Sequence, residues 1–577
     1  MMKFLFVPLH KPFLFLYFLL SCSPLFCQLF PAKNYPKGYF IYPVEAKIGL
    51  AANFGELRPN HFHMGLDCRT DQHQNARVVA AADGYIAHVR IEPSGFGRAI
   101  YINHPNGLTT LYGHLNDFFP ELEKYVKEQQ YKQESWRVFL DIPANLFRVK
   151  KGQFIAFSGS TGASEGPHVH FEIRDTKSDK VLNPLLFGLP VPDNVPPALM
   201  RLAIYDRNLS TYSQAAKLYP LKKMSDGYIT SPATIIVTTN RVSFGVSAVD
   251  RYTGSNNPNG IYQAVVYDNN EPVNGFEIDS ITYDETRYVN AHIDYKLRAG
   301  GGPFVEHLSR LPGNPPGVYQ DFSGDGVIEL DDDSAHQVKV EVKDTYGNTS
   351  ILRFALKRGS VQKITEPNAS QKFIPNFTNV FERNDIQLIL DENALYDTVN
   401  FIYSKKNPSL PNTVSDIHSV HNGLVPVHDY LTIRLKANKS LEGINADKII
   451  IERTWNGKTD VVKPKREGDW FTGKFRSFGD FQLVVDDIPP NIVPVGIREN
   501  ADLSHSSQVI FSITDNMKEI KNFRAELDGK WLRFTNDKGR SFIYKFDEMC
   551  PPGNHELKVS VEDEAGNVAT KIFHFTR

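Results

Sequence analysis

One strictly alternating segment, residues 168–173, constrains the fold of this chain more than any other stretch. His168, His170 and Glu172 alternate there with apolar residues, directly after a Gly- and Ser-rich turn at 158–167. Because successive side chains of a strand point to opposite faces, the two histidines and the glutamate share one face and the apolar residues face a core. Two neighbouring imidazoles suit a metal ligand and a proton-transfer partner. The alternation alone fits a plain strand with two surface histidines as well.

Length and composition point to several folded, β-rich domains. The 577 residues exceed what one core holds, and roughly 150 residues per domain predicts about four domains. Hydrophobic residues at 41% and charged residues at 23% are ordinary for folded protein. The 25 Tyr and 39 Phe, together with frequent turn dipeptides, favour β-structure. The net charge of −2 gives no basis for a nucleic-acid partner, and we expect none.

The N-terminus is typical of an export signal. Lys3 and Lys11 flank an apolar run at 12–20, which is too short to span a bilayer and predicts a cleaved signal peptide over 1–27. The alternative is a lipoprotein signal, because Leu-Leu-Ser-Cys resembles a lipobox and would make Cys22 a lipid-modified N-terminus. Both predict a location in the periplasm or cell envelope.

Four cysteines do not make a disulfide framework. Cys22 and Cys27 belong to the predicted signal, and Cys68 and Cys550 lie in different predicted domains. We therefore expect the last two to be free thiols.

Residues 28–190 are predicted to form one β-rich domain. Turn signals predict two hairpins, over 78–91 and 98–112. Between them and the strand at 153–158 lies an insertion, about 116–149, whose central part has the composition of a helix. A proline-rich stretch at 190–197 then marks a domain boundary.

Beyond residue 190 the chain repeats a strand–turn–strand pattern. Residues 336–348 and 555–567 match, and both end in Asp-x-x-Gly-Asn, a turn in which glycine supplies a positive φ. Each copy follows, at a distance, a double proline. The pattern predicts immunoglobulin-like β-sandwiches at 191–358 and 487–577, with a third β-rich domain at 359–486.

A second motif has the spacing of a calcium loop. Residues 321–332 place oxygen-bearing side chains at positions 1, 3, 5 and 12, and Gly326 at position 6. However, Asp332 replaces the usual Glu and no flanking helices are predicted. A polar β-turn is therefore the alternative to a calcium (Ca2+) site.

A second group of metal-binding residue types lies at 60–67, Asn-His-Phe-His-Met-Gly-Leu-Asp. Gly65 lies between His63 and Asp67 and predicts a loop entering a strand rather than a helix. His63, Asp67 and His170 give two imidazoles and one carboxylate, a set suited to zinc with an open position for water. His168 and His114 remain for the base and the oxyanion donor that hydrolysis needs.

Three motifs in order carry a family resemblance: His-x-Gly-x-Asp at 63–67, Tyr-x-His-Leu at 112–115, and Gly-Pro-His-x-His-Phe-Glu at 166–172. Together they resemble the signature of the lysostaphin/LytM-type zinc metallopeptidases over roughly residues 45–190. The resemblance implies that His63, Asp67 and His170 bind one zinc ion (Zn2+). It also implies that His114 and His168 are catalytic, flanking the attacking water and stabilising the tetrahedral intermediate.

The expected fold class is mainly β: an N-terminal antiparallel β-sheet metallopeptidase domain with a small helical insertion, followed by three β-sandwich-like domains. The resemblance implies an exported zinc endopeptidase that hydrolyses peptide cross-links or stem peptides of bacterial peptidoglycan. The alternative is a catalytically silent LytM-like regulator or scaffold that docks cell-wall enzymes. Contacts of the β domains with cell-envelope proteins are a further hypothesis. The insertion is expected to narrow the groove or to dock a partner, and the alternative is a solvated surface helix without a role.

Two residues beside the predicted ligands have alternatives. Cys68 follows Asp67 directly, and either packs as a small core residue or offers a thiolate ligand. His61, two residues before His63, is expected to be structural or to support a ligand from outside.

Overall fold

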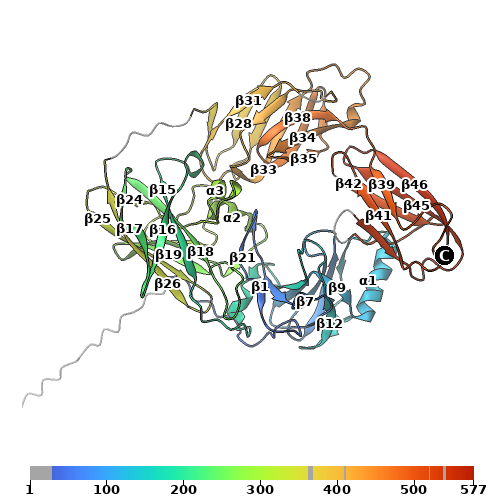
Figure 1. Cartoon of the computed structure of the whole chain (residues 1–577), viewed down its shortest axis with the longest axis horizontal. Helices are drawn as coiled ribbons and strands as arrows, with labels where there is room; N and C mark the ends of the chain where they lie inside the picture. Colours follow the sequence, from blue (N-terminus) through green and yellow to red (C-terminus); the bar gives the residue numbers. More distant parts are fainter. Residues whose placement is uncertain (1–28, 361–367, 409–410, 519, 537–540) are drawn as a thin grey trace, which may run out of the picture. The chain divides into compact units, whose positions relative to one another are not determined.

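The computed structural model describes residues 29–360, 368–408, 411–518, 520–536 and 541–577 (Figure 1). The predicted signal peptide and Cys22 therefore lie outside the described residues. Residues up to Tyr35 and residues Pro36–Arg577 are separate compact units, and the second unit holds everything that follows. None of the described helices combines the length and the apolar character that crossing a membrane requires.

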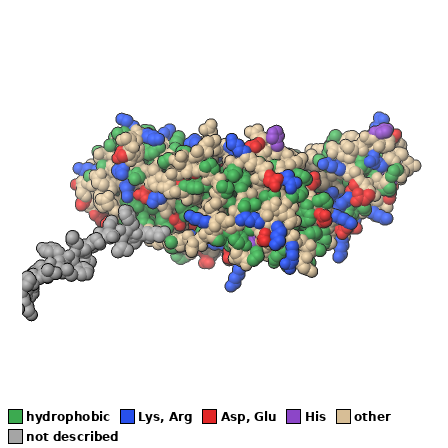
Figure 2. Space-filling view, turned by 90° about the horizontal axis from the view of Figure 1, so that it is seen from below, with side chains coloured by type: hydrophobic (Ala, Val, Ile, Leu, Met, Phe, Trp, Pro, Cys, Tyr) green, Lys and Arg blue, Asp and Glu red, His purple; other side chains and the backbone are tan. Residues whose placement is uncertain are grey.

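Strands dominate the structure, which confirms the mainly β fold class (Figure 1). The described α-helices are α1 (Pro120–Gln133), α2 (Val289–His292) and α3 (Tyr295–Ala299). Charged side chains of both signs are interspersed over the face in Figure 2, in keeping with a net charge near zero.

An antiparallel sheet forms the first domain, as predicted, and β13 lies inside it with strands on both sides. Its order is β1-β4-β13-β8-β7-β6-β10, and β5-β12-β9 form a smaller sheet. The bounds are β1 (Leu50–Ala52), β2 (Leu57–Arg58), β3 (His61–Phe62), β4 (Leu66–Arg69), β5 (Arg77–Val79), β6 (Gly84–Ile91), β7 (Arg98–Asn103), β8 (Leu108–Gly113), β9 (Leu115–Phe118), β10 (Val138–Asp141), β11 (Arg148–Val149), β12 (Phe154–Ser158), β13 (His168–Asp175) and β14 (Val181–Leu182).

One of the two predicted hairpins is confirmed and the other is wrong. β7 and β8 pair across the turn at 104–107, as expected. β5 and β6 do not pair with each other, because β5 joins β12 in the smaller sheet. Both edges of β6 are already occupied, by β7 on one side and by β10 and β11 on the other. The last two strands come from the insertion, so this segment extends the sheet as well as forming a helix.

The predicted helix in the insertion is confirmed. α1 begins with Pro120 in its first turn, where the missing N–H costs no hydrogen bond. Leu122, Val126 and Gln130 recur every four residues and are buried. On another side the Nζ atom of Lys127 lies 2.7 Å from a carboxylate oxygen of Asp547. The helix therefore buries one face in its own domain and pairs through Lys127 with Asp547, in the segment after β44 (Ser541–Lys545).

Residues 198–358 form an eleven-stranded sheet in the order β22-β18-β15-β16-β17-β26-β25-β19-β20-β23, with β24 beside β18. The bounds are β15 (Ala198–Asp206), β16 (Lys217–Met224), β17 (Gly227–Val237), β18 (Arg241–Val249), β19 (Gln263–Asp268), β20 (Glu271–Glu277), β22 (Glu306–His307), β23 (Tyr319–Asp321), β24 (Ile328–Glu329), β25 (Ala335–Lys343) and β26 (Thr349–Arg358). β21 (Ser280–Ile281) instead pairs with β14 and so extends the first sheet.

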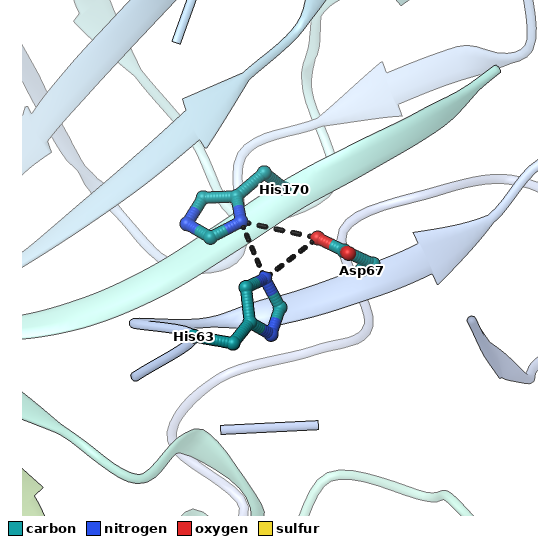
Figure 3. Close-up of side chains that lie close together, drawn as sticks. All are labelled: His63, Asp67 and His170. Atoms are coloured by element: carbon teal, nitrogen blue, oxygen red, sulfur yellow. Dashed lines mark hydrogen bonds and ion pairs between the residues drawn. The ribbon is translucent and has the colours of Figure 1, made fainter. Parts of the chain in front are cut away.

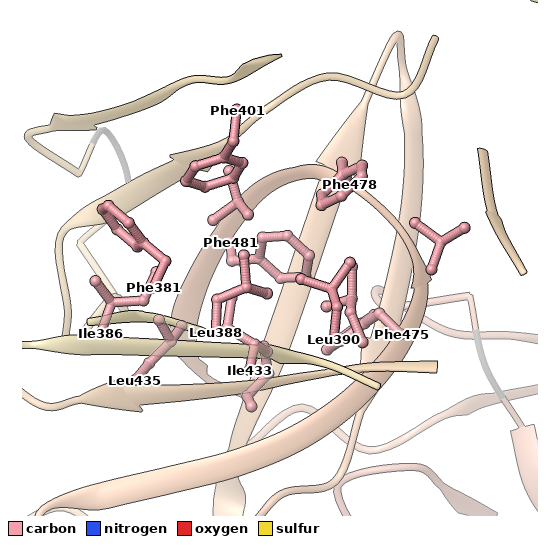
Figure 4. Close-up of a cluster of buried hydrophobic side chains, with 14 of the residues drawn as sticks. Phe381, Ile386, Leu388, Leu390, Phe401, Ile433, Leu435, Phe475, Phe478 and Phe481 are labelled. Carbon is pink, nitrogen blue, oxygen red and sulfur yellow. The ribbon is translucent and has the colours of Figure 1, made fainter. Parts of the chain in front are cut away.

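Residues 371–485 form two five-stranded sheets around a core of phenylalanines and aliphatic residues (Figure 4). The strands are β28 (Asn379–Arg383), β29 (Ile386–Leu390), β31 (Tyr403–Lys406), β32 (Ile417–Val420), β33 (Pro426–Lys436), β34 (Ile449–Trp455), β35 (Lys458–Val462), β36 (Lys465–Glu467), β37 (Trp470–Ser477) and β38 (Gly479–Val485), with β27 (Gln371–Phe373) and β30 (Val399–Phe401) as a separate pair.

The C-terminal residues form a three-stranded sheet, β39-β41-β44, and a five-stranded one, β40-β46-β45-β42-β43. The bounds are β39 (Asn491–Val495), β40 (Ala501–Asp502), β41 (Gln508–Thr514), β42 (Ile520–Leu527), β43 (Lys530–Trp531), β44 (Ser541–Lys545), β45 (Asn554–Asp563) and β46 (Val568–Thr576).

The repeated strand–turn–strand pattern has the predicted form. β25 pairs antiparallel with β26, and β45 with β46. Gly347 and Gly566 have φ of 86° and 80°, the left-handed region that glycine enters without steric cost. The immunoglobulin-like assignment of the two flanking domains stays a prediction.

The calcium prediction at 321–332 is not supported. Arg310 donates to the Asp321 carboxylate and Asn274 donates to it as well, so this first ligand position is already compensated. Within the described residues, the side chains of 321–332 are absent from the groups whose geometry could hold a metal. Residues 321–332 instead form short strands and turns, in line with the polar β-turn that was the alternative to a calcium site.

Candidate metal centre

Three buried side chains converge on one point (Figure 3). The Nε2 atom of His63 lies 2.9 Å from Oδ1 of Asp67 and 3.0 Å from Nδ1 of His170. The Nδ1 atom of His170 lies 3.1 Å from the same Asp67 oxygen. Two imidazole nitrogens and one carboxylate oxygen thus face one another, the donor set from which zinc sites with an open position are built. The structure brings together the three residues predicted as ligands.

Strand register places Asp67 beside His170. β4 and β13 pair antiparallel with these residues directly opposite each other, so their side chains lie on the same face. His63 precedes β4 and reaches the same face through the turn at Met64 and Gly65. A Cβ atom on Gly65 would lie 2.6 Å from the Phe171 carbonyl oxygen and 2.8 Å from Nε2 of His170. A residue without a side chain is required at this position.

Each histidine of this triad is oriented by its other nitrogen. Nδ1 of His63 lies 2.6 Å from the Asn53 carbonyl oxygen, and Nε2 of His170 lies 2.9 Å from Oε1 of Glu172. Donation from these outer N–H groups leaves the inner nitrogens as lone-pair donors, the arrangement that raises the basicity of metal-binding histidines. Glu172 is itself fully buried and accepts hydrogen bonds from Arg174 and from the hydroxyl of Tyr283.

Electrostatics keep the carboxylates of this site ionised. Burial alone would raise the pKa of Asp67, but His63, His168 and His170 outweigh it and hold that pKa well below its usual range. Burial would likewise raise the pKa of Glu172, yet Arg174, His170 and Tyr283 lower it to about 2. Burial would lower the pKa of His170, but hydrogen bonds to Asp67 and Glu172 raise it to about 9. Asp67 and Glu172 are therefore both ionised near neutral pH.

The two histidines predicted as catalytic lie beside the triad. His114 and His168 have ring centroids 4.8 Å apart, and Nε2 of His168 lies 3.3 Å from Oδ1 of Asp67. Nδ1 of His114 donates to the Thr161 carbonyl at 2.8 Å, and Nδ1 of His168 donates to the Gly166 carbonyl at 2.8 Å. Burial, followed by His168 and His170, lowers the pKa of His114 to about 3, so its imidazole is neutral near pH 7.

The five residues open into a groove of about 830 Å³. Its walls include Arg58, Phe96, Glu165 and Tyr283. Tyr283 follows β21 and belongs to the chain beyond residue 190, so the next domain contributes part of the wall. Among the described residues, the lining takes nothing from the insertion at 116–149. The groove is therefore bordered by the following domain rather than by the insertion.

Sequence reasoning missed the residues that support the ligands. Glu172 had a usable signal, because it lies two residues after His170 on the same strand face. Asn53 acts through a backbone carbonyl, which carries no residue signature. Tyr283 is more than a hundred positions from Glu172 in the chain, and no local pattern links the two.

The positions of Cys68 and His61 decide between the alternatives predicted for them. Cys68 points away from the triad, is fully buried and remains a free thiol, as does Cys550, which confirms that expectation. Burial raises the pKa of the Cys68 thiol, which opposes the thiolate that metal binding needs. His61 lines the groove, and its Nδ1 lies 3.0 Å from the Pro59 carbonyl oxygen. His61 is therefore a wall residue beside the ligands.

Comparison with known proteins agrees with this geometry. Residues 61–131 and 146–184 match peptidase family M23, and residues 370–486 match the Zu5-like domain. An uncharacterized metalloprotease of Haemophilus influenzae is 31% identical over 163 residues, covering 27% of this chain and 28% of the relative. The DD-carboxypeptidase/endopeptidase Mpg of Neisseria meningitidis is 31% identical over 158 residues, covering 27% of each. The chain thus spans little more than a quarter of the length of these relatives.

Among solved structures, the catalytic domain of lysostaphin from Staphylococcus simulans is 24% identical, with a TM-score of 0.18. The match covers 25% of this chain and 91% of that chain. The groove, the triad and the family match together define a domain of the metallopeptidase class. The chain carries a peptidase family M23 domain, and all five site residues predicted from the sequence fall within the matched segments.

Proposed function

We propose that this protein is an exported zinc-dependent endopeptidase that hydrolyses peptide cross-links or stem peptides of bacterial peptidoglycan. The observation that carries the proposal is the convergence of His63, Asp67 and His170 at the base of an open groove, with two further histidines beside them. The similarity to a DD-carboxypeptidase/endopeptidase supports the choice of substrate.

The donor set fits zinc. His63 Nε2, Asp67 Oδ1 and His170 Nδ1 would hold the ion, since two imidazoles and a carboxylate leave one position for water. Zinc at this position would lower the pKa of that water and polarise the substrate carbonyl. Glu172 and the Asn53 carbonyl keep both histidines in the orientation that coordination needs.

Two histidines of the chain, His114 and His168, would transfer the protons of the reaction. His114 and His168 each have Nδ1 engaged by a backbone carbonyl, which presents Nε2 to the reacting groups. A neutral imidazole of this kind accepts a proton from the attacking water and returns it to the leaving amine. The imidazole that has taken up this proton bears an Nε2–H group, which donates to the developing oxyanion. Phe96 and Tyr283 in the groove walls provide apolar surface for an extended peptide.

The experiment is digestion of purified peptidoglycan, with released peptides identified by mass spectrometry. Activity should disappear with a chelator and return with zinc. His170→Ala should lose both zinc and activity, while His114→Ala should keep the zinc and lose at least about 100-fold in rate. His88→Ala is the matched control, because His88 is exposed and pairs with Asp141 outside the groove.

The alternative, a catalytically silent regulator or scaffold, would give a different result in this experiment. Wild-type protein that binds one zinc per chain but releases no peptide under any of these conditions would favour it. The proposed export has its own measurement: the mass of the mature N-terminus distinguishes cleavage before Gln28 from a lipid-modified Cys22.

A further inference from the structure

A second cluster of carboxylates lies beyond the peptidase domain. Asp193, Asp250 and Asp344 each offer an oxygen, and the three oxygens lie within 4.8 Å of one another. They come from separate segments: the proline-rich linker at 190–197, the residue that follows β18, and the turn between β25 and β26. Asp250 and Asp344 are only 1% and 2% exposed.

Hydrogen bonds within the β25–β26 turn reach only part of this cluster: the N–H groups of Tyr346 and Asn348 and the Asn348 amide donate to Asp344. In the part of the chain that the structure describes, none of the three carboxylates forms an ion pair with a lysine or an arginine. Buried carboxylates without a partner are costly, so such a group binds either protons or a cation. Burial, then Asp193 and Asp344, raises the pKa of Asp250 to about 8, and burial raises that of Asp193 to about 6.

Two carboxylate oxygens of the cluster are unpaired. The Oδ1 atom of Asp250 and the Oδ2 atom of Asp193 are buried and have no hydrogen-bond partner. A neutral amide oxygen, that of Asn259, is a second and independent indication of a bound cation. Asn259 is 3% exposed and its Oδ1 atom also lacks a partner. Asn259 and Asp250 exchange both backbone hydrogen bonds, so their side chains lie next to each other on one face.

We propose that Asp193, Asp250 and Asp344, with the amide oxygen of Asn259, form a binding site for a hard divalent cation, with calcium as the fitting ion. Calcium takes six to eight oxygen ligands at about 2.3–2.6 Å, so two oxygens on one ion lie up to about 5 Å apart, as these oxygens do. The donor set contains no nitrogen or sulfur, which separates it from the zinc-type triad at His63.

The C-terminal domain provides an internal comparison. Asp486, Asp515 and Asp563 occupy corresponding places: before a double proline, directly after a strand, and in the Asp-x-x-Gly-Asn turn. There Nδ2 of Asn516, the residue after Asp515, donates to Asp486 at 2.9 Å. The corresponding residue after Asp250 is Arg251, which has no side-chain amide. Among the described residues these three do not approach closely enough to form a metal-binding group. In the C-terminal copy the Asn516 amide thus bonds one of the carboxylates, while Oδ1 of Asp515 is buried without a hydrogen-bond partner.

The site would fasten the linker to the sheet. An ion bound by all three carboxylates ties residue 193 to the end of β18 and to the β25–β26 turn. Because the ion binds only the folded arrangement, it stabilises the fold by RT ln(1 + c/Kd), where c is the free calcium concentration. We expect calcium at about 100 times its dissociation constant to raise the melting temperature by about 5 °C.

The test uses the whole protein, stripped with EDTA, dialysed and given one equivalent of zinc. Calcium chloride is titrated while the melting temperature and the heat of binding are followed. Wild type should bind one calcium per chain and gain stability. Asp250→Asn should lose both responses, yet melt in chelator no lower than wild type, since the change removes repulsion. Asp515→Asn is the matched control and should respond as wild type does.

A His170→Ala background separates this site from the zinc centre, and the calcium response should persist in it. The proposal is overturned if wild type shows no calcium response, which would mean that the cluster holds protons. It is also overturned if Asp250→Asn or Asp193→Asn responds as strongly as wild type.

Discussion

Gly65 is the residue on which the packing of the triad depends most directly. It separates His63 from Asp67, and its Cα faces the imidazole of His170 and the backbone of Phe171. The distances that an added methyl group would meet, 2.8 Å and 2.6 Å, are shorter than carbon side chains tolerate. One partner is backbone inside a paired strand, which cannot move aside cheaply.

Replacing Gly65 with alanine should therefore displace His170. We expect Gly65→Ala to weaken zinc binding by at least about 10-fold, measured by competition with a chromogenic chelator. Gly166→Ala is the control, since a Cβ there meets nothing within 4 Å and the backbone has no positive φ. Equal zinc affinity in the two variants would contradict the steric argument.

His307 makes stability depend on pH at a distance from the triad. It lies in β22, is 1% exposed, and burial, followed by Arg207 and His292, lowers its pKa to about 3. Between pH 6.5 and 3 the unfolded chain binds a proton at this position that the folded chain does not, so stability falls as the pH falls.

We expect proton uptake by His307 in the unfolded chain to lower the free energy of unfolding by roughly 3 kcal/mol as the pH falls from 6.5 to 4. His307→Phe keeps the ring and removes the titration, so its unfolding free energy should fall less steeply over the same range. Urea unfolding at several pH values measures both slopes. Parallel slopes for the variant and wild type would show that His307 does not titrate as inferred.

At the scale of elements, β13 carries His168, His170 and Glu172 on one face, and its neighbours complete the site. β4 brings Asp67 opposite His170, and the end of β8 brings Gly113 opposite it, with His114 next in the chain. The segment after β21 brings Tyr283, whose hydroxyl donates to Glu172 at 2.5 Å. Tyr283 is thus a positioning residue that acts on the triad through Glu172.

Loss of that hydroxyl should loosen the orientation of His170. We expect Tyr283→Phe to weaken zinc binding about 3- to 10-fold and Glu172→Gln about 10- to 100-fold, in that order because Glu172 contacts the ligand directly. Chelator competition measures both. Tyr288→Phe, in the same segment but stacked on His428, should bind zinc as wild type does. A Tyr288→Phe effect as large as that of Tyr283→Phe would indicate general loosening instead.

At the scale of the whole molecule, residues beyond 190 hold the loop that contains His63. Asn53, whose carbonyl orients His63, exchanges two side-chain hydrogen bonds with the backbone of Gly260. Thr286 bonds the backbone N–H and carbonyl of Phe62. The β-rich domain after the linker is therefore part of the support of the metal centre.

A chain ending at residue 190 should bind zinc more weakly and melt at a lower temperature than the full chain, because it lacks Gly260, Tyr283 and Thr286. Chelator competition and thermal unfolding of the two proteins provide the comparison. Higher peptidoglycan hydrolysis by the shortened chain would argue that the following domain covers the groove rather than supports it.

Local signals predicted those features that depend on neighbours in the chain. Alternation at 168–173 indicated a strand with both histidines on one face, and Asp-x-x-Gly-Asn indicated turns that need a positive φ. The composition of 121–132 indicated α1. Each of these is decided by dihedral preferences and hydrophobic periodicity within about a dozen residues.

Other features had no local signal. The hairpin expected over 78–91 is replaced by pairing between β5 and β12, because strands from the insertion occupy the free edge of β6. In the calcium-loop motif at 321–332, the first carboxylate, Asp321, accepts a hydrogen bond from Arg310, which lies outside the motif.

For this protein, the sequence by itself determined the donor types, the order of the three motifs and the identity of the five residues around the candidate metal centre. Only the tertiary structure decided what surrounds them: Glu172 held by Tyr283, Asn53 held by Gly260, and three distant aspartates gathered beside Asn259. The reason is physical. Residue type and spacing record local backbone geometry, whereas burial, charge compensation and hydrogen-bond partners arise between segments that meet only when the chain has folded.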